Sequence, residues 1–215
     1  LLLSCYDGDK CSFNIEDFNS QTVKNLVDDI AYRPFVEDGK VWKVGYSDSG
    51  NPVKRIQYYY FDGDTIIDGR ICKKMMCQQY VNPDYPGHDY SLYMGAWYEE
   101  DKKVYWTKGE ESEIMYDFSL AANAPLPPSH YVLGARQTGG LDGFKGVYRD
   151  VIVPEEEGPN GHVTSWLEGV GDLNGPFVQF YNTYIVQQQP PFLMSCVVGD
   201  EVIYLNDEYE DEATS

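Results

Sequence analysis

The stretch VKRIQYYYFDGDTIIDGRICKKMMCQQYV, from Val53 to Val81, decides the fold class. Its first arm, 53–61, is rich in β-branched and aromatic residues, which favour pleated strands over helices, and its second arm, 71–81, begins with Ile71 and ends with Tyr80-Val81. Asp62-Gly63 and Asp68-Gly69 lie between the arms, and Asp-Gly pairs are typical of two-residue hairpin turns. We therefore expect two antiparallel strands joined by a tight connection.

The same signals recur along the rest of the chain. Asp38-Gly39 and Gly199-Asp200 supply further hairpin turns, and Glu99–Lys102 forms a longer polar one. Ten more segments have strand-like composition: 41–46, 90–98, 103–107, 113–118, 131–136, 144–153, 163–166, 177–186, 192–198 and 202–205. So many short strands at close spacing predict an all-β fold, an antiparallel meander that closes into a barrel or splits into two packed sheets.

One segment has a different period. From Ser20 to Ile30 apolar residues recur at helical spacing, with Ser20 as a possible N-cap, and Arg33-Pro34 would end the helix. We expect one short N-terminal helix here. The chain then divides into an N-terminal segment and linker (1–19), a single β-rich domain (20–205) and an acidic tail (206–215).

Charge and the N-terminal sequence restrict the partners. The 215 residues include 16 basic and 35 acidic side chains, a net charge of −19, which disfavours nucleic acid and anionic lipid surfaces. The sequence has no apolar run long enough for a membrane-spanning helix.

Leu1-Leu2-Leu3-Ser4-Cys5 is similar to a lipobox, the bacterial signal for lipidating a cysteine. We expect an exported protein of the cell envelope or outer surface, attached to the membrane only through a lipid on Cys5.

Residue types that carry chemistry do not form a recognisable site. The five cysteines and three histidines lack metal-ligand spacing, and no Gly-x-Ser-x-Gly elbow is present. Cys196 lies in an apolar segment and is expected to be inert core rather than a nucleophile partnered by His162. Asp62-Gly63-Asp64 lacks the EF-hand ligand pattern. No catalytic residue, no metal and no cofactor is predicted.

Two pairs of carboxylates leave a hydrolase open as an alternative. Glu168 and Asp172 flank a glycine turn, and Glu99 and Glu100 lie close to Trp97. Glycoside hydrolysis needs two carboxylates at a set separation across a cleft. With 35 acidic residues, near neighbours also arise by chance.

The segment Ser91–Tyr98 suggests a ligand-binding face. Its alternation places Leu92, Met94 and Ala96 on one side of a strand, and Tyr93 with Trp97 on the other. Across the following hairpin, Tyr105 or Trp106 should lie opposite this pair. The residues Tyr93, Trp97, Tyr105 and Trp106 would then form an aromatic platform for a neutral glycan or a basic peptide. The alternative is that the platform is covered and belongs to the core.

Five segments, taken in order, resemble a group of secreted or lipidated, largely uncharacterised β-rich proteins of Bacteroidetes. They are Pro34–Trp42, Phe61–Arg70, Tyr116–Leu120, Trp166–Gly171 and Cys196–Tyr204. The resemblance implies export and a β-rich fold, and it supplies no catalytic residues. Within these segments Trp166 is expected to fill a core position beside Gly169 and Gly171.

These observations favour a non-enzymatic module of the cell envelope or surface, with a glycan or a protein as its partner. Two alternatives stay open: a hydrolase acting on surface polysaccharide or peptide, and a structural spacer in a larger envelope assembly.

Overall fold

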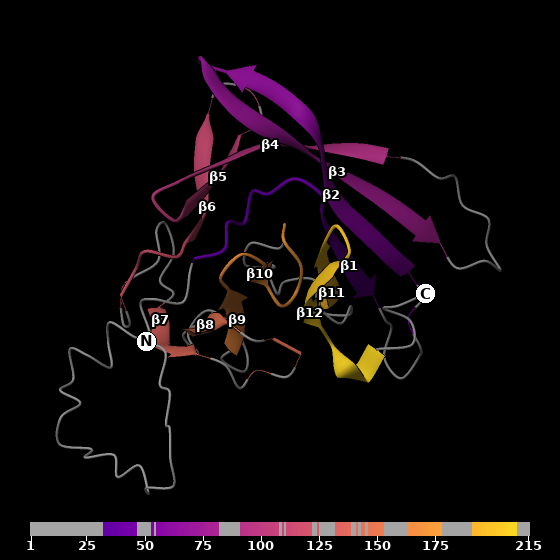
Figure 1. Cartoon of the computed structure of the whole chain (residues 1–215), viewed down its shortest axis with the longest axis vertical. Helices are drawn as coiled ribbons and strands as arrows, with labels where there is room; N and C mark the ends of the chain where they lie inside the picture. Colours follow the sequence, from indigo (N-terminus) through magenta and orange to yellow (C-terminus); the bar gives the residue numbers. More distant parts are fainter. Residues whose placement is uncertain are drawn as a thin grey trace, which may run out of the picture. The chain divides into compact units, whose positions relative to one another are not determined.

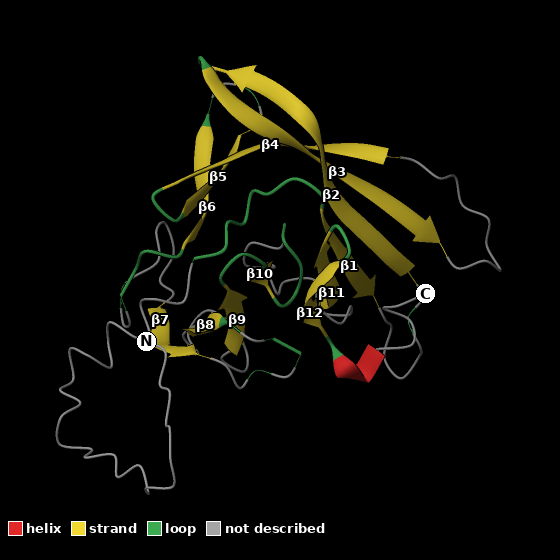
Figure 2. Cartoon of the chain, viewed as in Figure 1, coloured by secondary structure: helices red, strands yellow, loops and turns green. Residues whose placement is uncertain are grey.

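The computed structural model describes residues 32–46, 53, 55–81, 91–107, 109, 111–121, 124, 132–138, 141, 143–144, 146–152, 163–177 and 191–209. They belong to one compact unit, which begins at Tyr32. Nearly all of its regular structure is β (Figure 2), which confirms the predicted all-β class. The predicted helix over 20–30 lies outside the described residues, as does the predicted strand over 177–186 except for Phe177, which is in a turn. No helix among the described residues is long and apolar enough to cross a membrane.

The larger sheet has eight antiparallel strands in the order β12-β11-β1-β2-β3-β4-β5-β6, and it curls strongly (Figure 1). Its strands are β1 (Lys40–Tyr46), β2 (Arg55–Ile67), β3 (Arg70–Val81), β4 (Ser91–Glu100), β5 (Lys103–Thr107), β6 (Ser112–Asp117), β11 (Phe192–Val198) and β12 (Glu201–Leu205). Among the described strands β6 and β12 are the two edges of this sheet and do not pair with each other. The eight strands therefore form a half-barrel rather than a closed barrel.

The smaller sheet has four antiparallel strands in the order β10-β9-β8-β7. These are β7 (Val132–Thr138), β8 (Val147–Ile152), β9 (Val163–Leu167) and the two-residue β10 (Gly171–Asp172), which has no sequence signal of its own. A backbone hydrogen bond connects the two sheets, since the N–H of Leu193 in β11 donates to the carbonyl of Leu173, the residue after β10, at 2.6 Å.

The order of the larger sheet departs from a simple meander. Strands β1 to β6 follow one another, as expected, but β11 and β12 return to pair on the free side of β1. In that pairing Trp42 lies opposite Cys196 on one side and opposite Tyr59 on the other. The first strand of the unit therefore needs a segment some 150 residues later to complete its hydrogen bonding.

The Asp-Gly pairs have three different roles. Asp68-Gly69 forms the predicted β2–β3 hairpin, with φ of 50° and 78°. Asp62-Gly63 was expected to be a hairpin turn as well, but it lies inside β2 as a bulge, where the register shifts between Phe61 and Asp64. A bulge of this kind bends the strand. Asp38-Gly39 turns into β1, yet the residues before it are not a strand.

Aromatic side chains fill the inside of the curl. The ring of Phe35 lies 5.1 Å from Trp42, 5.5 Å from Trp97 and 5.2 Å from Tyr116 (centroid distances). Trp166 is 4% exposed and packs edge-on against Tyr116, which confirms its predicted place in the core. Burying several rings of this size supplies most of the hydrophobic stabilisation of such a fold.

The last described residues, 206–209, follow β12 and contact the larger sheet. A short 3-10 helix, η3 (Asp207–Tyr209), follows β12, and the Tyr209 ring stacks on Phe192 at 4.4 Å. The Asn206 backbone N–H donates to the Met194 carbonyl at 2.8 Å. Within the segment expected as an acidic tail, Asn206 and Tyr209 therefore contact the sheet, whereas Asp207 and Glu208 are exposed.

Candidate functional site

The predicted platform residues do not share one face. In the β3–β4 pairing Met75 lies opposite Gly95 and Met76 opposite Tyr93, so Met94 is an extra residue in β4. This bulge reverses the alternation, and Gly95 accommodates it with a φ of 109°. Tyr93 consequently points outward and is 46% exposed, whereas Trp97 is fully buried. The expectation that Tyr93 and Trp97 lie side by side is wrong.

Of the other two predicted residues, Trp106 lies opposite Trp97, as one of the two expected registers requires, and Tyr105 lies on the other face of the sheet. Trp106, opposite Trp97, packs edge-on against Phe177 at 5.6 Å and donates its indole N–H to the Met94 carbonyl at 2.6 Å. Tyr105 stacks in parallel with Tyr98 at 4.6 Å, on the opposite face of the sheet from Trp97. Of the four, only Tyr93 combines a half-exposed ring with a place on the outer face of β2–β4.

A different set of tyrosines forms an aromatic outer surface. Cross-strand pairing aligns Tyr60 with Met76 and Met76 with Tyr93, and it aligns Tyr58 with Gln78 in the next row. We call Tyr58, Tyr60 and Tyr93 the tyrosine face. The Tyr60 hydroxyl lies 2.9 Å from the Ser91 hydroxyl, within hydrogen-bonding distance, which connects β2 to β4 across β3.

A hollow of about 570 Å³ opens beside this face. It is lined by Gly39, Lys40, Val41, Tyr58, Tyr60, Phe61 and Gln78. The sequence contains the signal for it, because in the run Tyr58-Tyr59-Tyr60 a strand must direct the first and third rings to the same side. Tyr59 takes the other side and is 6% exposed. The sequence predicts a strand here, and the common face of Tyr58 and Tyr60 follows from the alternation of that strand.

A positive charge lies next to the tyrosine face. Lys43 is 5% exposed, and its ammonium is 5.6 Å from the centre of the Tyr58 ring. Tyr58 is the residue opposite Lys43 in the β1–β2 pairing. The ammonium is attracted to the ring and keeps it in place.

The first pair of candidate carboxylates has structural partners. Glu168 is buried and forms an ion pair with Arg149 at 3.0 Å. The same guanidinium donates to the carbonyls of Asp117 and Phe118 at the end of β6, which ties the two sheets together. Asp172 is buried too and accepts the backbone N–H of Asn174 at 2.7 Å. This pair therefore does not flank an open cleft.

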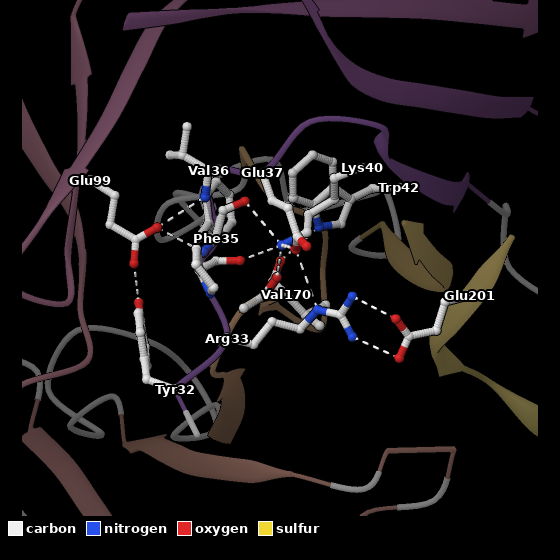
Figure 3. Close-up of polar contacts among 12 residues, drawn as sticks. Tyr32, Arg33, Phe35, Val36, Glu37, Lys40, Trp42, Glu99, Val170 and Glu201 are labelled. Atoms are coloured by element: carbon white, nitrogen blue, oxygen red, sulfur yellow. Dashed lines mark hydrogen bonds and ion pairs between the residues drawn. The ribbon is translucent and has the colours of Figure 1, made fainter. Parts of the chain in front are cut away.

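The second pair is also engaged. One carboxylate oxygen of Glu99 accepts the backbone N–H groups of Phe35 and Val36 at 2.7 and 3.0 Å, and the other accepts the Tyr32 hydroxyl (Figure 3). Glu100 pairs with Arg70 at 3.3 Å. Glu99 thus anchors residues 32–38, which we call the N-terminal strap, to β4.

Two cations hold the rest of the strap. Arg33 donates two parallel hydrogen bonds to Glu201 at 2.9 and 2.8 Å (Figure 3). Lys40 is fully buried, and its ammonium donates to the Pro34, Phe35 and Gly169 carbonyls and pairs with Glu37 at 3.1 Å. The strap is therefore fixed at several points to strands far away in the sequence.

The Arg33–Glu201 pair gives a testable pH dependence. Arg33 lowers the pKa of Glu201 below its ordinary value of 4.5. A carboxyl group whose pKa is lower in the folded state stabilises the fold at pH values above its ordinary pKa. This stabilisation is lost as the pH falls from the ordinary pKa through the lowered, folded-state pKa. Glu201→Gln should therefore be less stable than wild type near pH ~6, and the difference should disappear near pH ~2, measured by urea unfolding. An equal difference at both pH values would contradict this.

The thiols and acidic turns show no sign of chemistry. Cys72, Cys77 and Cys196 are free and buried, and burial raises the pKa of each thiol, which keeps it protonated and unreactive. At the Asp62–Asp64 bulge the Lys73 ammonium pairs with Asp64 at 2.6 Å and with Asp38 at 2.7 Å. No cluster of three possible metal ligands occurs in the described part of the chain, whereas Cys5 and the histidines lie outside it.

The described residues thus present an aromatic surface with a hollow on β1–β4, and their candidate catalytic carboxylates have structural partners. In comparisons with family models, curated proteins and solved structures, nothing matches this chain.

Proposed function

We propose that this protein is a non-enzymatic module of the bacterial cell envelope or surface that binds a neutral glycan on its tyrosine face. The observation that carries the proposal is the hollow of about 570 Å³ beside Tyr58 and Tyr60, with the half-exposed Tyr93 in the same cross-strand row as Tyr60. Its volume is in the range of small-ligand sites. Aromatic rings offer flat apolar surfaces to the C–H faces of sugars, and the Gln78 amide can bond to hydroxyl groups.

The charges near the hollow favour a neutral ligand. Among the described residues that line it none is acidic, and the basic one, Lys40, has its ammonium bound to the strap. With a net charge of −19, the chain as a whole repels polyanions. A neutral sugar would not be repelled by the net charge, and it would leave no charged group of the lining without a counterion.

Substitutions on the tyrosine face provide the test. Tyr60→Ala and Tyr93→Ala should each weaken binding of a neutral glycan selected on an array by about tenfold, as loss of one ring contact implies. Tyr60→Phe should keep most of the affinity, because the ring surface remains. Calorimetric titration of the purified variants gives the dissociation constants.

Tyr209→Ala is the matched control, since Tyr209 stacks on Phe192 and does not line the hollow. It should leave glycan affinity unchanged. The proposal fails if no neutral glycan binds, or if the tyrosine-face variants bind as tightly as wild type while retaining its melting temperature.

The hydrolase alternative has less support. It requires two carboxylates across an open cleft, with one of them protonated. Glu168 and Asp172 are instead buried and hydrogen-bonded, and Glu99 is used to hold the strap.

Attachment to the envelope is a separate part of the proposal and rests on the sequence at Cys5. In a bacterial host fed a labelled fatty acid, the wild-type protein should become labelled and Cys5→Ser should not. Equal labelling of the two proteins would refute lipidation at this residue, without affecting the argument for the tyrosine face.

A further inference from the structure

A second hollow, of about 490 Å³, lies where the tip of the β2–β3 hairpin meets β4, β5 and β6. Its lining residues are Ile67, Asp68, Gly69, Arg70, Cys72, Tyr98, Thr107 and Ser112. None of them belongs to the tyrosine face. The lining offers a ligand one cation, one carboxylate and the Ser112 hydroxyl beside an apolar wall, because Thr107 is fully buried and its hydroxyl donates to the Gly109 carbonyl.

The cation in this hollow is held in place by aromatic rings. The guanidinium carbon of Arg70 is 4.1 Å from the centre of the Tyr98 ring. The other face of Tyr98 rests in parallel on Tyr105 at 4.6 Å. An arginine stacked in this way keeps its planar fork of N–H donors in a fixed orientation, so little side-chain freedom is lost when it binds a ligand.

The guanidinium N–H groups of Arg70 have only a weak hydrogen-bond partner among the described residues. In the described part of the chain its guanidinium donates one hydrogen bond, to Glu100, at 3.3 Å. Both side chains are about half exposed or more, 48% for Arg70 and 60% for Glu100. An ion pair as long and as hydrated as this contributes little, so an incoming carboxylate can replace it.

The same contacts prevent a sugar from stacking on the ring of Tyr98. Both faces of Tyr98 are covered, one by Arg70 and the other by Tyr105. A ligand in this hollow must therefore be recognised by its polar groups. Arg70 suits a carboxylate bound through two parallel hydrogen bonds, while Asp68 and Ser112 suit hydroxyl groups.

We propose that this hollow binds a carboxylate-bearing sugar, a hexuronate, with Arg70 on the carboxylate. The site is independent of the tyrosine face and of the neutral glycan proposed for it. A hexuronate has the one carboxylate and several hydroxyl groups that the lining matches, and a single sugar ring fits within the volume of the hollow.

The test is a titration of the full chain with D-glucuronate, D-galacturonate and a short oligogalacturonate, followed by NMR, with D-glucose as the neutral counterpart. Either uronate should bind at least about tenfold more tightly than glucose, since one charge-assisted pair is worth that much. Because the net charge of −19 repels polyanions, the free sugars should bind more tightly than the oligomer, whereas tighter binding of the oligomer would identify the ligand as a residue within a polymer.

Substitutions at Arg70 connect the binding to the proposed contact. Arg70→Gln should lower uronate affinity at least about tenfold, and Arg70→Lys should lower it severalfold because the planar fork is lost. Glu100→Gln should raise the affinity, since it removes the competing carboxylate. Arg55→Gln is the matched control: its guanidinium carbon lies 4.0 Å from the Tyr46 ring, and it does not line the hollow.

Three results would overturn the proposal: no uronate binding by the wild-type chain, equal binding of glucose, or equal losses in Arg70→Gln and Arg55→Gln. Tyr60→Ala separates the two sites, because it should weaken neutral-glycan binding and leave uronate binding unchanged. If Arg70→Gln does not fold, the gain expected for Glu100→Gln and the loss expected for Arg70→Lys still decide the question.

Discussion

Trp97→Ala is expected to lower the free energy of unfolding by about 3–5 kcal/mol, as removal of a buried tryptophan generally does. Trp97 is fully buried, stacks on Phe35 at 5.5 Å and meets Phe177 edge-on at 5.9 Å. Its removal would open a cavity between the strap and the sheet. Urea unfolding followed by circular dichroism measures the change.

Tyr93→Ala is the control for Trp97→Ala, since both residues lie in β4 but only Trp97 is in the core. Its half-exposed ring should contribute less than about 1 kcal/mol to stability. A loss below roughly 1 kcal/mol for Trp97→Ala would show that the core does not depend on this indole.

Lys40→Met is expected to destabilise the fold by about 3 kcal/mol, even though methionine matches the length of the lysine stem. The ammonium of Lys40 satisfies the Pro34, Phe35 and Gly169 carbonyls and is the partner of Glu37. Methionine would leave these buried acceptors without a donor. Chemical unfolding near pH ~7 gives the difference, and a variant as stable as wild type would contradict this account.

The stability difference between wild type and Lys40→Met should also depend on pH. Burial lowers the pKa of Lys40 below its ordinary value of 10.5, and Glu37 offsets only part of the effect. Between the lowered pKa and 10.5 the unfolded chain binds more protons than the folded one, so the wild type gains stability as the pH rises. The variant lacks this gain. Its deficit should therefore widen as the pH approaches about 10, whereas a constant deficit would argue against the lowered pKa.

The strands and most turns could be predicted because their signals are local. Eleven of the twelve predicted strands fall within or across described residues, and each of these corresponds to an observed strand. The Asp68-Gly69 and Gly199-Asp200 turns join strands as expected. Period-two alternation and turn residues depend only on near neighbours, so one sequence is enough to recognise them.

The candidate site was placed incorrectly because one extra residue changes the facing of a strand. Met94 has no partner residue in β3. The residues of β4 before Met94 therefore point to the opposite face from the one that strict alternation, counted back from Trp97, predicts. Gly95 carried a weak signal, since an isolated glycine within a strand pattern suggests a bulge. A bulge there leaves Tyr93 outside and Trp97 inside.

The contacts of the strap could not be predicted because they join residues far apart in the chain. Arg33 meets Glu201, and Glu99 meets the backbone at Phe35 and Val36. Charged residues of this kind usually indicate a solvated surface. Only the folded arrangement shows that Lys40, with a polar sequence around it, is fully buried.

The pairing of β1 with β11 has a consequence for the order of events during folding. Until Phe192–Val198 has left the ribosome, one edge of β1 has no partner from that strand, and Glu201 is not yet available to hold Arg33. Contacts between residues so distant in sequence make folding slow, since a long loop must close first. Shorter nascent chains would expose the aromatic core, so this protein should depend on chaperones until its last strands are made.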